Sequence, residues 1–575
     1  MSQPIELLYH ERGTEEYERS VATSNLLYRF SRPERVAQPK TIAEVEQVIQ
    51  EAIRKNLRIT IKNGGHSFAG SSTASEGISL DLVKLNTAEL SLDLATVTLG
   101  GGAKWAHAYK TLINGGHDGF AINGGRCPTV GVSGFILGGG LGPFTRSFGM
   151  GSDTLKEAKI VTAKKGIVVV KDTDKWETDK GKLFWALRGA GGGNFGVVVE
   201  TKLEVKKLRS DTVVAGRYNW FPKPETLASP KPEMGQADNR FLKFMNAIYK
   251  YQWDDEMTID TSWLCDLGIR QASTGLGIRF LTYFNGGDTE FEKAIKSFSD
   301  QYSQLLGGKE DPMAQLIRRS LPEASTRFLH ETLVAQWSEE TKKAFPDNKT
   351  YSRYSSFVFD NKESEIEKIT LLIQGQMDSF RKKFTGEKVF LQVTWIHSGG
   401  QARRQDKSTS AFYWRDATYH TYIMVEWEDK WMERDMRAFL QAFKDELRPY
   451  SLEQKASFIN FPDEALDSGP HGTAYYGENY SKLQVVKEIW DPDNFFNWSQ
   501  GVQLPLSPDS NKNPSTKEPS QPKGEEDLTD KIAGGQWKQM TEQWKNDWKE
   551  GKHFQFDDPL ATLMGFAGVD IGIQS

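Results

Sequence analysis

The chain has 575 residues, 38% of them hydrophobic, which is enough to bury more than one core, so two or more domains are expected. Its 72 basic and 77 acidic residues give a formal net charge of −5 and are interspersed along the chain. This pattern disfavours a nucleic-acid-binding protein, which would need a clustered basic face. No run of about 18 apolar residues occurs, so we expect no helix that spans a membrane.

The first strong helix signal begins after Thr41. Thr41 and Glu44 form a capping-box pattern, and apolar residues then recur at helical spacing, so we predict a helix that ends near Asn56. The β-branched run over 58–61 that follows is typical of a buried strand.

A glycine-rich loop, Lys62 to Ser71, follows this strand and reads KNGGHSFAGS. Its glycines allow the backbone to turn sharply and to approach a ligand closely. Successive N–H groups in such a loop can bind an anion such as a pyrophosphate. His66 lies in the middle of the loop.

The next elements are expected as a strand–turn–strand over 78–82 and 95–99, a helix over 103–113, and a β-pair over 153–163 and 166–170. Within this part, residues 123–142 read NGGRCPTVGVSGFILGGGLG and contain Cys127, one of only two cysteines. A third glycine-rich turn, residues 185–196, precedes a strand over 197–205. Taken alone, this third turn would be read as a plain hairpin.

From about residue 208 to 450 the composition shifts. Strand-like runs alternate there with amphipathic helical stretches, which predicts an antiparallel sheet covered on one side by helices. The strand runs are 213–220, 277–283, 389–395 and 419–427.

Residues 471–503 contain Tyr-x-x-Asn-Tyr-x-x-Leu followed by Asp-Pro-x-Asn-x-Phe. Residues 507–530 are rich in Ser, Pro, Lys and Glu and are expected to be a flexible linker. After it, Trp537, Trp544 and Trp548 fall on one helical face. Two interpretations stay open: a helix docked on its own protein, or a partner- or dimer-binding segment.

With these motifs in their order, the sequence resembles the berberine-bridge-enzyme-like FAD-linked oxidases of the vanillyl-alcohol oxidase (PCMH-type FAD-binding) superfamily. The resemblance covers residues 30–205 and 455–503. It implies an α+β fold with a two-part PCMH-type FAD-binding domain and a substrate domain whose antiparallel sheet is covered by helices. The expected division is an N-terminal arm and FAD domain (1–207), a substrate domain (208–455), a berberine-bridge C-terminal element that returns to the FAD domain (456–506), and the linker with the Trp-rich extension (507–575).

The resemblance also implies a cofactor, FAD, linked covalently twice. His66 occupies the position that bonds to the 8α-methyl group, and Cys127 the position that bonds to flavin C6. Tyr476 and Asn479 are expected to contact the flavin or to order a loop. The other residues expected to contact FAD are Lys62, Asn63, Gly64, Gly65, Ser67, Gly70, Ser71, Val130, Gly131, Gly134, Gly138, Gly139, Gly140, Gly193, Asn194, Gly196 and Val198.

Oxidation of a substrate needs a base, and two candidates stay open. Tyr475 matches the position of a tyrosine base in the family. Counting back from Trp427 places His420 where plant members carry a catalytic glutamate, although a one-residue slip would make it structural. The predicted substrate pocket contains His397, Tyr413, Trp414 and Tyr422.

The resulting prediction is an FAD-dependent oxidase that transfers a hydride from a small organic molecule, an intracellular natural-product intermediate, to FAD, with O2 reduced to H2O2. In the family, valine at the Val130 position accompanies oxidases. The alternatives are a carbohydrate (oligosaccharide) oxidase of the same family, a non-redox cyclase that uses FAD as a scaffold, and a flavoprotein that binds a partner through its Trp-rich tail. No metal-ligand spacing is present, so no metal site is predicted. A cytoplasmic location is expected because the N-terminus lacks signal-peptide features and Cys265 would have no disulfide partner.

Overall fold

The computed structural model describes residues 9–227, 239–268, 275–308, 310–337, 349–466 and 470–505. Three β-sheets organise residues up to 430 together with residues 447–505, which form one unit. Helix α16 (Glu433–Leu447), up to Glu446, belongs to a second unit and is described alone. Within it, Arg437 pairs with Glu433 one turn earlier, and Gln441 donates a hydrogen bond to Asp445 at 2.9 Å.

The first sheet carries the predicted strand before the His66 loop. Its order is β1-β2-β4-β3, in which β2, β4 and β3 run parallel and β1 pairs antiparallel with β2. The strands are β1 (Tyr9–Glu11), β2 (Arg35–Ala37), β3 (Ile59–Lys62) and β4 (Ile78–Asp81). The predicted helix is confirmed as α2 (Ile42–Lys55), where the Thr41 hydroxyl accepts from the Glu44 N–H and Asn56 ends the helix in the left-handed conformation.

The second sheet is antiparallel and has the order β5-β6-β10-β8-β9, with β7 also paired to β10. The predicted pair of β8 with β9 is confirmed. The predicted strand–turn–strand is wrong, because its two strands, β4 and β6, lie in different sheets and β5 is the partner of β6. The strands are β5 (Ala88–Ser91), β6 (Thr96–Gly100), β7 (Phe120–Ile122), β8 (Leu155–Thr162), β9 (Gly166–Lys171) and β10 (Val197–Lys207).

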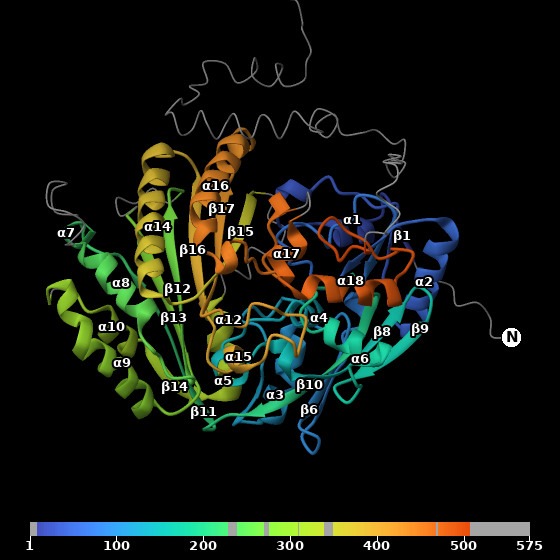
Figure 1. The fold of residues 1–575 in the computed structure, drawn as a ribbon, viewed down its shortest axis with the longest axis horizontal. Helices are drawn as coiled ribbons and strands as arrows, with labels where there is room; N and C mark the ends of the chain where they lie inside the picture. Colours follow the sequence, from blue (N-terminus) through green and yellow to red (C-terminus); the bar gives the residue numbers. More distant parts are fainter. Residues whose placement is uncertain are drawn as a thin grey trace, which may run out of the picture. The chain divides into compact units, whose positions relative to one another are not determined.

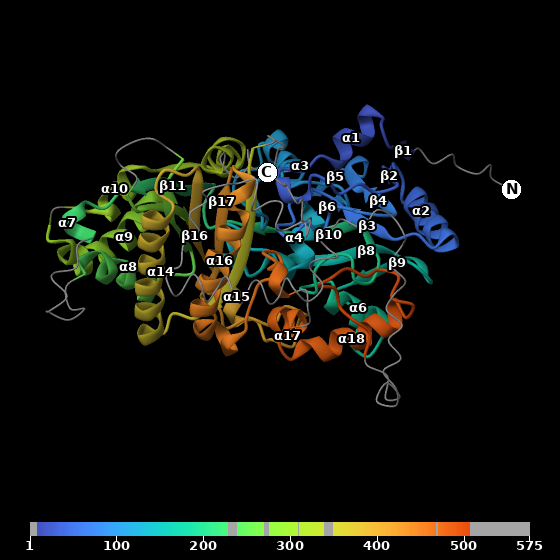
Figure 2. The same cartoon turned by 90° about the horizontal axis from the view of Figure 1, so that it is seen from above.

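The third sheet has seven strands, all antiparallel, in the order β14-β11-β13-β12-β16-β17-β15. Helices α8 (Arg240–Lys250), α9 (Asp288–Tyr302) and α14 (Glu363–Lys383) lie on one side of it (Figures 1 and 2). The predicted helix-covered antiparallel sheet of the substrate domain is thus confirmed. The strands are β11 (Thr212–Trp220), β12 (Met257–Asp266), β13 (Gly277–Phe284), β14 (Ser320–Ala324), β15 (Tyr351–Phe359), β16 (Val389–His397) and β17 (Tyr419–Trp427).

The C-terminal element returns to the first part of the chain. Helices α17 (His471–Tyr476) and α18 (Asn479–Trp490) follow the third sheet, and α18 packs against α6 (Asp179–Ala186). The indole of Trp490 donates to the carbonyl of Asp179 at 3.1 Å. The stretch after the third sheet therefore packs on residues of the first 207 of the chain.

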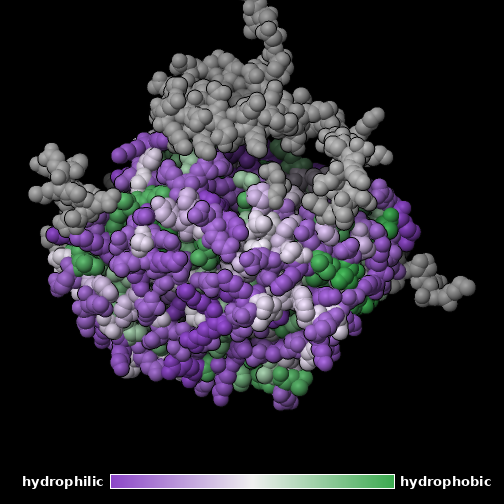
Figure 3. All heavy atoms as spheres, in the orientation of Figure 1, coloured by the Kyte–Doolittle hydropathy of each residue, from purple (hydrophilic) through white to green (hydrophobic). Residues whose placement is uncertain are grey.

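Shorter helices complete the described fold. They are α1 (Glu15–Val21), α3 (Trp105–Gly115), α4 (Val132–Leu137), α5 (Thr145–Phe148), α7 (Pro224–Leu227), α10 (Pro312–Arg318), α11 (Ser325–Arg327), α12 (Leu333–Gln336) and α15 (Gln401–Arg404). The face seen in Figure 3 is mostly hydrophilic, with small separate hydrophobic patches. Across the described helices, none combines the length and apolarity needed to cross a bilayer. The predicted linker and the Trp-rich extension lie outside the described residues.

Candidate functional site

A cavity of about 420 Å³ lies between the glycine-rich segments and the third sheet. All three glycine-rich segments contribute to its wall, through residues such as Gly64, Gly131 and Gly193. Tyr354 and Tyr422 of the sheet also line it. Segments that are far apart in the sequence therefore form one site.

The first two glycine-rich loops touch one another directly. A Cβ atom at Gly64 would lie 2.6 Å from the backbone nitrogen of Gly131, so only glycine allows this approach. Asn63 fixes the contact, because its amide donates to the carbonyl of Gly101 at 2.6 Å and to Oγ of Ser133 at 2.7 Å.

His66 and Cys127 both line the cavity, and one hydroxyl group joins them. Oγ1 of Thr129 lies 3.0 Å from Nε2 of His66 and 3.2 Å from Sγ of Cys127. The two residues expected to bond to the cofactor therefore come together, although their loops are separated in sequence. The role of Thr129 was missed, although the residue stands inside the Cys-Pro-Thr-Val-Gly motif.

The wall includes most of the residues expected to contact FAD. Those that line the cavity are Asn63, Gly64, Gly65, His66, Ser67, Ser71, Cys127, Val130, Gly131, Gly134, Gly193, Gly196 and Val198. Those that do not line it are Lys62, Gly70, Gly138, Gly139, Gly140, Asn194, Tyr476 and Asn479. The contacts of this second group place its members next to the wall, and for Tyr476 and Asn479 they agree with the alternative that these two residues order a loop.

Glycines in the second group make room for neighbouring side chains. A Cβ at Gly70 would lie 2.6 Å from the ring of Tyr28, and one at Gly138 would lie 2.0 Å from Oδ1 of Asn460. Tyr28 and Asn460 themselves line the cavity. These glycines thus leave room for Tyr28 and Asn460, two residues of the cavity wall that were not predicted from the sequence.

Polar residues in the second group hold the loops. Nζ of Lys62 donates to the carbonyl of Ser20 at 2.5 Å, and Oδ1 of Asn194 accepts the N–H of Val502 at 2.9 Å. The Tyr476 hydroxyl donates to the carbonyl of Ala190 at 2.7 Å. Asn479 donates to backbone carbonyls of residues 407–411.

The cavity wall fits an FAD molecule. A Cβ at Gly134 would meet nothing within 4 Å, so the first turns of α4 present bare backbone to the cavity. Oδ1 of Asn63 is buried and has no hydrogen-bond partner among the described residues, which leaves an acceptor for a hydroxyl or N–H of the cofactor. Open space above glycine together with an unsatisfied acceptor is the environment that a flavin nucleotide needs.

Aromatic rings form the opposite wall. Phe68, from the His66 loop, stacks on Tyr354 of β15 with ring centroids 3.8 Å apart. Phe461 lies 5.6 Å from Phe68 and 5.0 Å from Tyr422. Sequence reasoning found only Tyr422, because the other rings come from a loop, a strand that was not predicted and the segment before α17. This wall is suited to a flat or apolar substrate.

Tyr422 is connected to a buried polar chain on the same face of the sheet. Its hydroxyl accepts a hydrogen bond from Nε2 of Gln392 at 3.2 Å, and Gln392 also contacts Oγ1 of Thr394 at 2.7 Å. Thr394 shares a hydrogen bond of 3.0 Å with Ser262, to which Nη2 of Arg279 donates at 3.3 Å. The chain fixes the Gln392 amide with its N–H directed at the Tyr422 oxygen.

Tyr475, the first predicted base, is not part of the cavity wall. Its side chain is 2% exposed and packs in the core of the FAD part. The hydroxyl donates to Oε1 of Gln500 at 2.6 Å and accepts the N–H of Asp463 at 3.1 Å. The prediction is wrong because the helical turn of α17 directs residue 475 into the core.

His420, the second predicted base, is also absent from the cavity wall. It is 1% exposed, lies against the rings of Phe412 and Phe458, and shares a hydrogen bond of 2.9 Å between Nδ1 and Oγ of Ser398. Burial, with the nearby Arg415 guanidinium, lowers the pKa of His420 to about 3. The imidazole is therefore a neutral core group, and the structural alternative holds.

This burial predicts a pH dependence of stability. The unfolded chain binds the His420 proton near its ordinary pKa of 6.5 and the folded chain only near 3, so stability is lost as the pH falls through this window. His397, whose pKa burial also lowers, acts in the same direction. Between pH 7 and 5 the His420 contribution amounts to about 2 kcal/mol.

Urea unfolding of His420→Gln is expected to show a smaller loss of unfolding free energy between these pH values than the parent chain. His330→Gln, a change at an exposed histidine, should behave as the parent. Equal losses in all three chains would contradict the assignment.

The other predicted pocket residues, except Tyr422, are buried behind the wall. His397 stacks on Tyr419 and accepts the N–H of Ile259 on Nδ1 at 3.3 Å. The Trp414 indole donates to the carbonyl of Ala474 at 2.9 Å, and the Tyr413 hydroxyl donates to Glu453 at 3.0 Å. Placing these three residues in the pocket is therefore corrected.

An ion pair ties the cysteine loop to the third sheet. Arg126, which precedes Cys127, places Nε 2.6 Å from Oδ2 of Asp260 on β12, and both side chains are at most 4% exposed. Arg126 also donates to the carbonyl of Leu141 at 2.7 Å. Removing one partner of a buried ion pair leaves an uncompensated charge, so Arg126 and Asp260 are held together. The position of Cys127 therefore depends on the third sheet.

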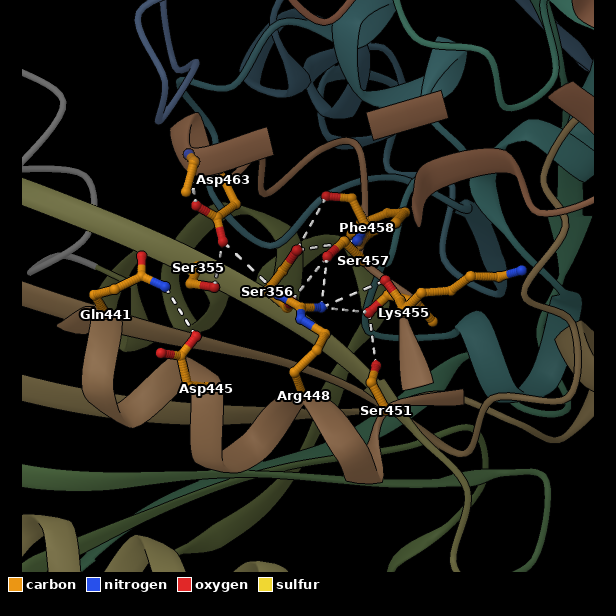
Figure 4. A network of polar contacts seen from close by, with 12 residues as sticks. Ser355, Ser356, Gln441, Asp445, Arg448, Ser451, Lys455, Ser457, Phe458 and Asp463 are labelled. Atoms are coloured by element: carbon orange, nitrogen blue, oxygen red, sulfur yellow. Dashed lines mark hydrogen bonds and ion pairs between the residues drawn. The ribbon is translucent and has the colours of Figure 1, made fainter. Parts of the chain in front are cut away.

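A second network fixes the segment that carries Asn460 and Phe461 (Figure 4). Nη1 of Arg448 donates to Oγ of Ser457 at 3.0 Å and to the carbonyl of Ala456 at 3.1 Å. Oγ of Ser355 on β15 donates to Oδ2 of Asp463 at 2.7 Å. The segment that carries Phe461 is thus anchored on both sides, by Arg448 before it and by Ser355 of β15 after it.

Comparison with known proteins finds two matching domains and several relatives. An FAD binding domain matches residues 33–171, and a berberine and berberine-like element matches residues 457–503. An uncharacterized FAD-linked oxidoreductase of Bacillus subtilis is 26% identical over 466 residues, which cover 80% of this chain and 90% of the relative. A tetrahydroberberine oxidase of Berberis wilsoniae is 25% identical over 506 residues, covering 82% and 85%.

Solved structures share the fold. Berberine-bridge-like protein 1 of Physcomitrella patens superposes with a TM-score of 0.69 at 20% identity, covering 87% of this chain and 98% of that one. A chitooligosaccharide oxidase gives 0.70 at 19% identity, with the same coverage. The two domain matches, in order along the chain, and the relatives that cover about four fifths of it support an FAD-linked oxidase that is similar to the berberine-bridge-enzyme-like proteins.

Proposed function

We propose that the chain carries FAD bonded to both His66 and Cys127, oxidises a small organic molecule by removal of a hydride, and uses O2 as the acceptor to give H2O2. The observation that carries the proposal is that His66 and Cys127 line one cavity and share the Thr129 hydroxyl, opposite a wall of aromatic rings. When bound, FAD supplies the two-electron chemistry, accepting the hydride and passing the electrons to O2.

The protein holds the cofactor and the substrate on opposite walls. The glycine loops bind the cofactor through backbone groups and the Asn63 acceptor, while Phe68, Tyr354 and Phe461 stack on the substrate and exclude water. We assign to Tyr422 the role of the base that takes the proton of the substrate as the hydride leaves. Tyr422 is an ionisable group on the aromatic wall, and Gln392 donates a hydrogen bond to its oxygen. That donation holds the Tyr422 oxygen in place at the cavity wall.

Val130 supports the choice of O2 as acceptor. It lines the cavity beside Cys127, and the family places valine at this position in oxidases. A short branched side chain there leaves room for a small gas molecule next to the cofactor.

The substrate is proposed to contain a flat, apolar portion. This favours an intermediate of natural-product synthesis over an oligosaccharide, although the tetrahydroberberine oxidase and the chitooligosaccharide oxidase among the similar proteins make both classes the first to test. A panel of aromatic alcohols, cyclic tertiary amines and oligosaccharides separates them by bleaching of the flavin spectrum and release of peroxide. A compound that is converted without bleaching would instead support the cyclase alternative.

The double covalent linkage is tested by intact-mass spectrometry of the denatured chain. The parent chain is expected to carry the mass of one FAD, His66→Ala and Cys127→Ala should each retain it through the remaining bond, and the double variant should lose it. His107→Ala, in a histidine outside the cavity wall, is the matched control and should retain both bonds. A parent chain with no covalent FAD would overturn the proposal.

A further inference from the structure

The Thr129 hydroxyl lies between the two side chains proposed to bond to FAD. Its oxygen is 3.0 Å from Nε2 of His66 and 3.2 Å from Sγ of Cys127. His66 and Cys127 line the cavity, whereas Thr129 does not. One hydroxyl group therefore contacts both attachment residues.

The backbone around Thr129 holds this hydroxyl in place. The N–H of Val130 donates to the carbonyl of Cys127 at 3.2 Å, and the N–H of Ala106 on α3 donates to the carbonyl of Pro128 at 2.9 Å. A Cβ at Gly64 would lie 3.0 Å from the carbonyl oxygen of Thr129, so the His66 loop is packed directly on this turn. The three side chains therefore meet because two rigid loops meet.

A hydroxyl group donates one hydrogen bond and accepts others, so the two contacts are coupled. If Nε2–H of His66 donates to Thr129, the hydroxyl hydrogen is available to the Cys127 sulfur. This arrangement leaves the imidazole lone pair on Nδ1 and provides a donor to a thiolate. It thus prepares a nitrogen and a sulfur nucleophile at the same time. In the reverse arrangement Thr129 donates to Nε2 and accepts from the thiol, which keeps the sulfur protonated.

We propose that Thr129 is a positioning residue that prepares both His66 and Cys127 for bonding to the flavin. The inference rests on the double linkage proposed above. Each attachment replaces one flavin C–H bond with a C–N or a C–S bond. The hydrogen lost from carbon and the hydrogen lost from the side chain, with two electrons, end on O2 as H2O2.

The test compares Thr129→Val, which keeps the shape and removes the hydroxyl, with Thr129→Ser, which keeps the hydroxyl. Each is placed in the full chain and in the His66→Ala and Cys127→Ala backgrounds, so that each bond is followed alone. Chains produced under riboflavin limitation are supplied with FAD and air, and covalent FAD is measured by intact mass over time. Thr129→Val is expected to slow both attachments about 10- to 100-fold, because a hydrogen bond to a charged or reacting group is lost. Thr129→Ser should restore both rates.

Thr111→Val is the matched control, since the Thr111 hydroxyl caps a carbonyl of α3 at 2.7 Å and touches neither residue. It should attach FAD at the parent rate. Parent rates for both bonds in Thr129→Val, or slowing of one bond alone, would overturn the inference while leaving the double linkage intact. Absence of covalent FAD from the parent chain would instead remove the proposed function. Noncovalent flavin retention and the thermal midpoint show whether Thr129→Val has folded. If it has not, Thr129→Ala replaces it, and the inference holds if Thr129→Ala attaches FAD slowly while Thr129→Ser attaches it at the parent rate.

Discussion

Replacing Tyr422 with phenylalanine is expected to slow reduction of the flavin by about 10²- to 10⁴-fold, the usual contribution of a general base. The hydroxyl lies on the cavity wall and accepts the Gln392 amide at 3.2 Å, and phenylalanine keeps the ring packing against Phe461 while it removes the oxygen. The rate is followed by stopped-flow bleaching without O2, using the compound from the panel that bleaches the parent enzyme fastest. Because chemistry is affected and not binding, the concentration for half-maximal rate should change little.

Tyr354→Phe is the matched control. Its ring lies in the same aromatic wall, 6.3 Å from that of Tyr422, and its change should alter the rate only slightly. The remaining alternative is that Glu426, whose carboxyl side chain also lines the cavity, takes the proton, and Glu426→Gln tests it. A large loss in Glu426→Gln with a near-normal Tyr422→Phe would assign the proton to Glu426.

The buried chain behind Tyr422 explains how a tyrosine can be suited to this role. Tyr422 on β17, Thr394 on β16 and Ser262 on β12 occupy paired positions, and Gln392 lies two residues before Thr394 on β16. The chain ends at the Arg279 guanidinium of β13, opposite Ser262. Side chains at paired positions of antiparallel strands share one face, so the sheet register alone builds the chain. The buried polar groups on this face of the sheet therefore hold the residue to which we assign the proton, as well as stabilising the sheet.

Local signals predicted the elements that hold the cofactor. The helix after Thr41 and the glycine loops depend on residues adjacent in sequence, and for this reason α2 and the positions of His66 and Cys127 could be read directly. Pairing between strands is not local: β4 and β6 follow one another in sequence but join different sheets. No alternation of apolar residues within one strand specifies its partner.

The base could not be predicted for a related reason. His420 and Tyr422 are two residues apart on β17 and share a face of the sheet, opposite Ile396 and Thr394 of β16, respectively. Alternation therefore treats them alike. The difference between the two residues comes from packing: Phe412 and Phe458 cover His420 and bury it in the core, whereas Tyr422 lines the cavity. The prediction that Tyr475 faces the cavity was wrong because α17 has only six residues, too few to show from the sequence which of its faces is buried.

Replacing Lys487 with methionine is expected to cost about 3–5 kcal/mol of unfolding free energy, the usual loss when one partner of a buried ion pair is removed. Nζ of Lys487 lies 2.6 Å from Oδ2 of Asp491, and both side chains are at most 1% exposed. It also donates to the carbonyls of Asn194 at 2.8 Å and Phe496 at 2.5 Å. Methionine fills the space but leaves the Asp491 carboxylate uncompensated in a region where burial lowers the pKa of Lys487 itself.

The effect should reach the cofactor as well as stability. Asn194 belongs to the third glycine-rich turn, whose neighbour Gly193 lines the cavity, so Lys487 connects the C-terminal element to the FAD wall. Lys487→Met should therefore lower both the thermal midpoint and the fraction of chains that retain flavin, whereas Lys482→Met, an exposed lysine on the same helix, should change neither. Adding Asp491→Asn to Lys487→Met should recover part of the loss, because the unpaired charge is then removed. If Lys487→Met behaved as Lys482→Met, the C-terminal element would be held by its apolar contacts alone, and the return of the chain to the FAD part would not need this ion pair.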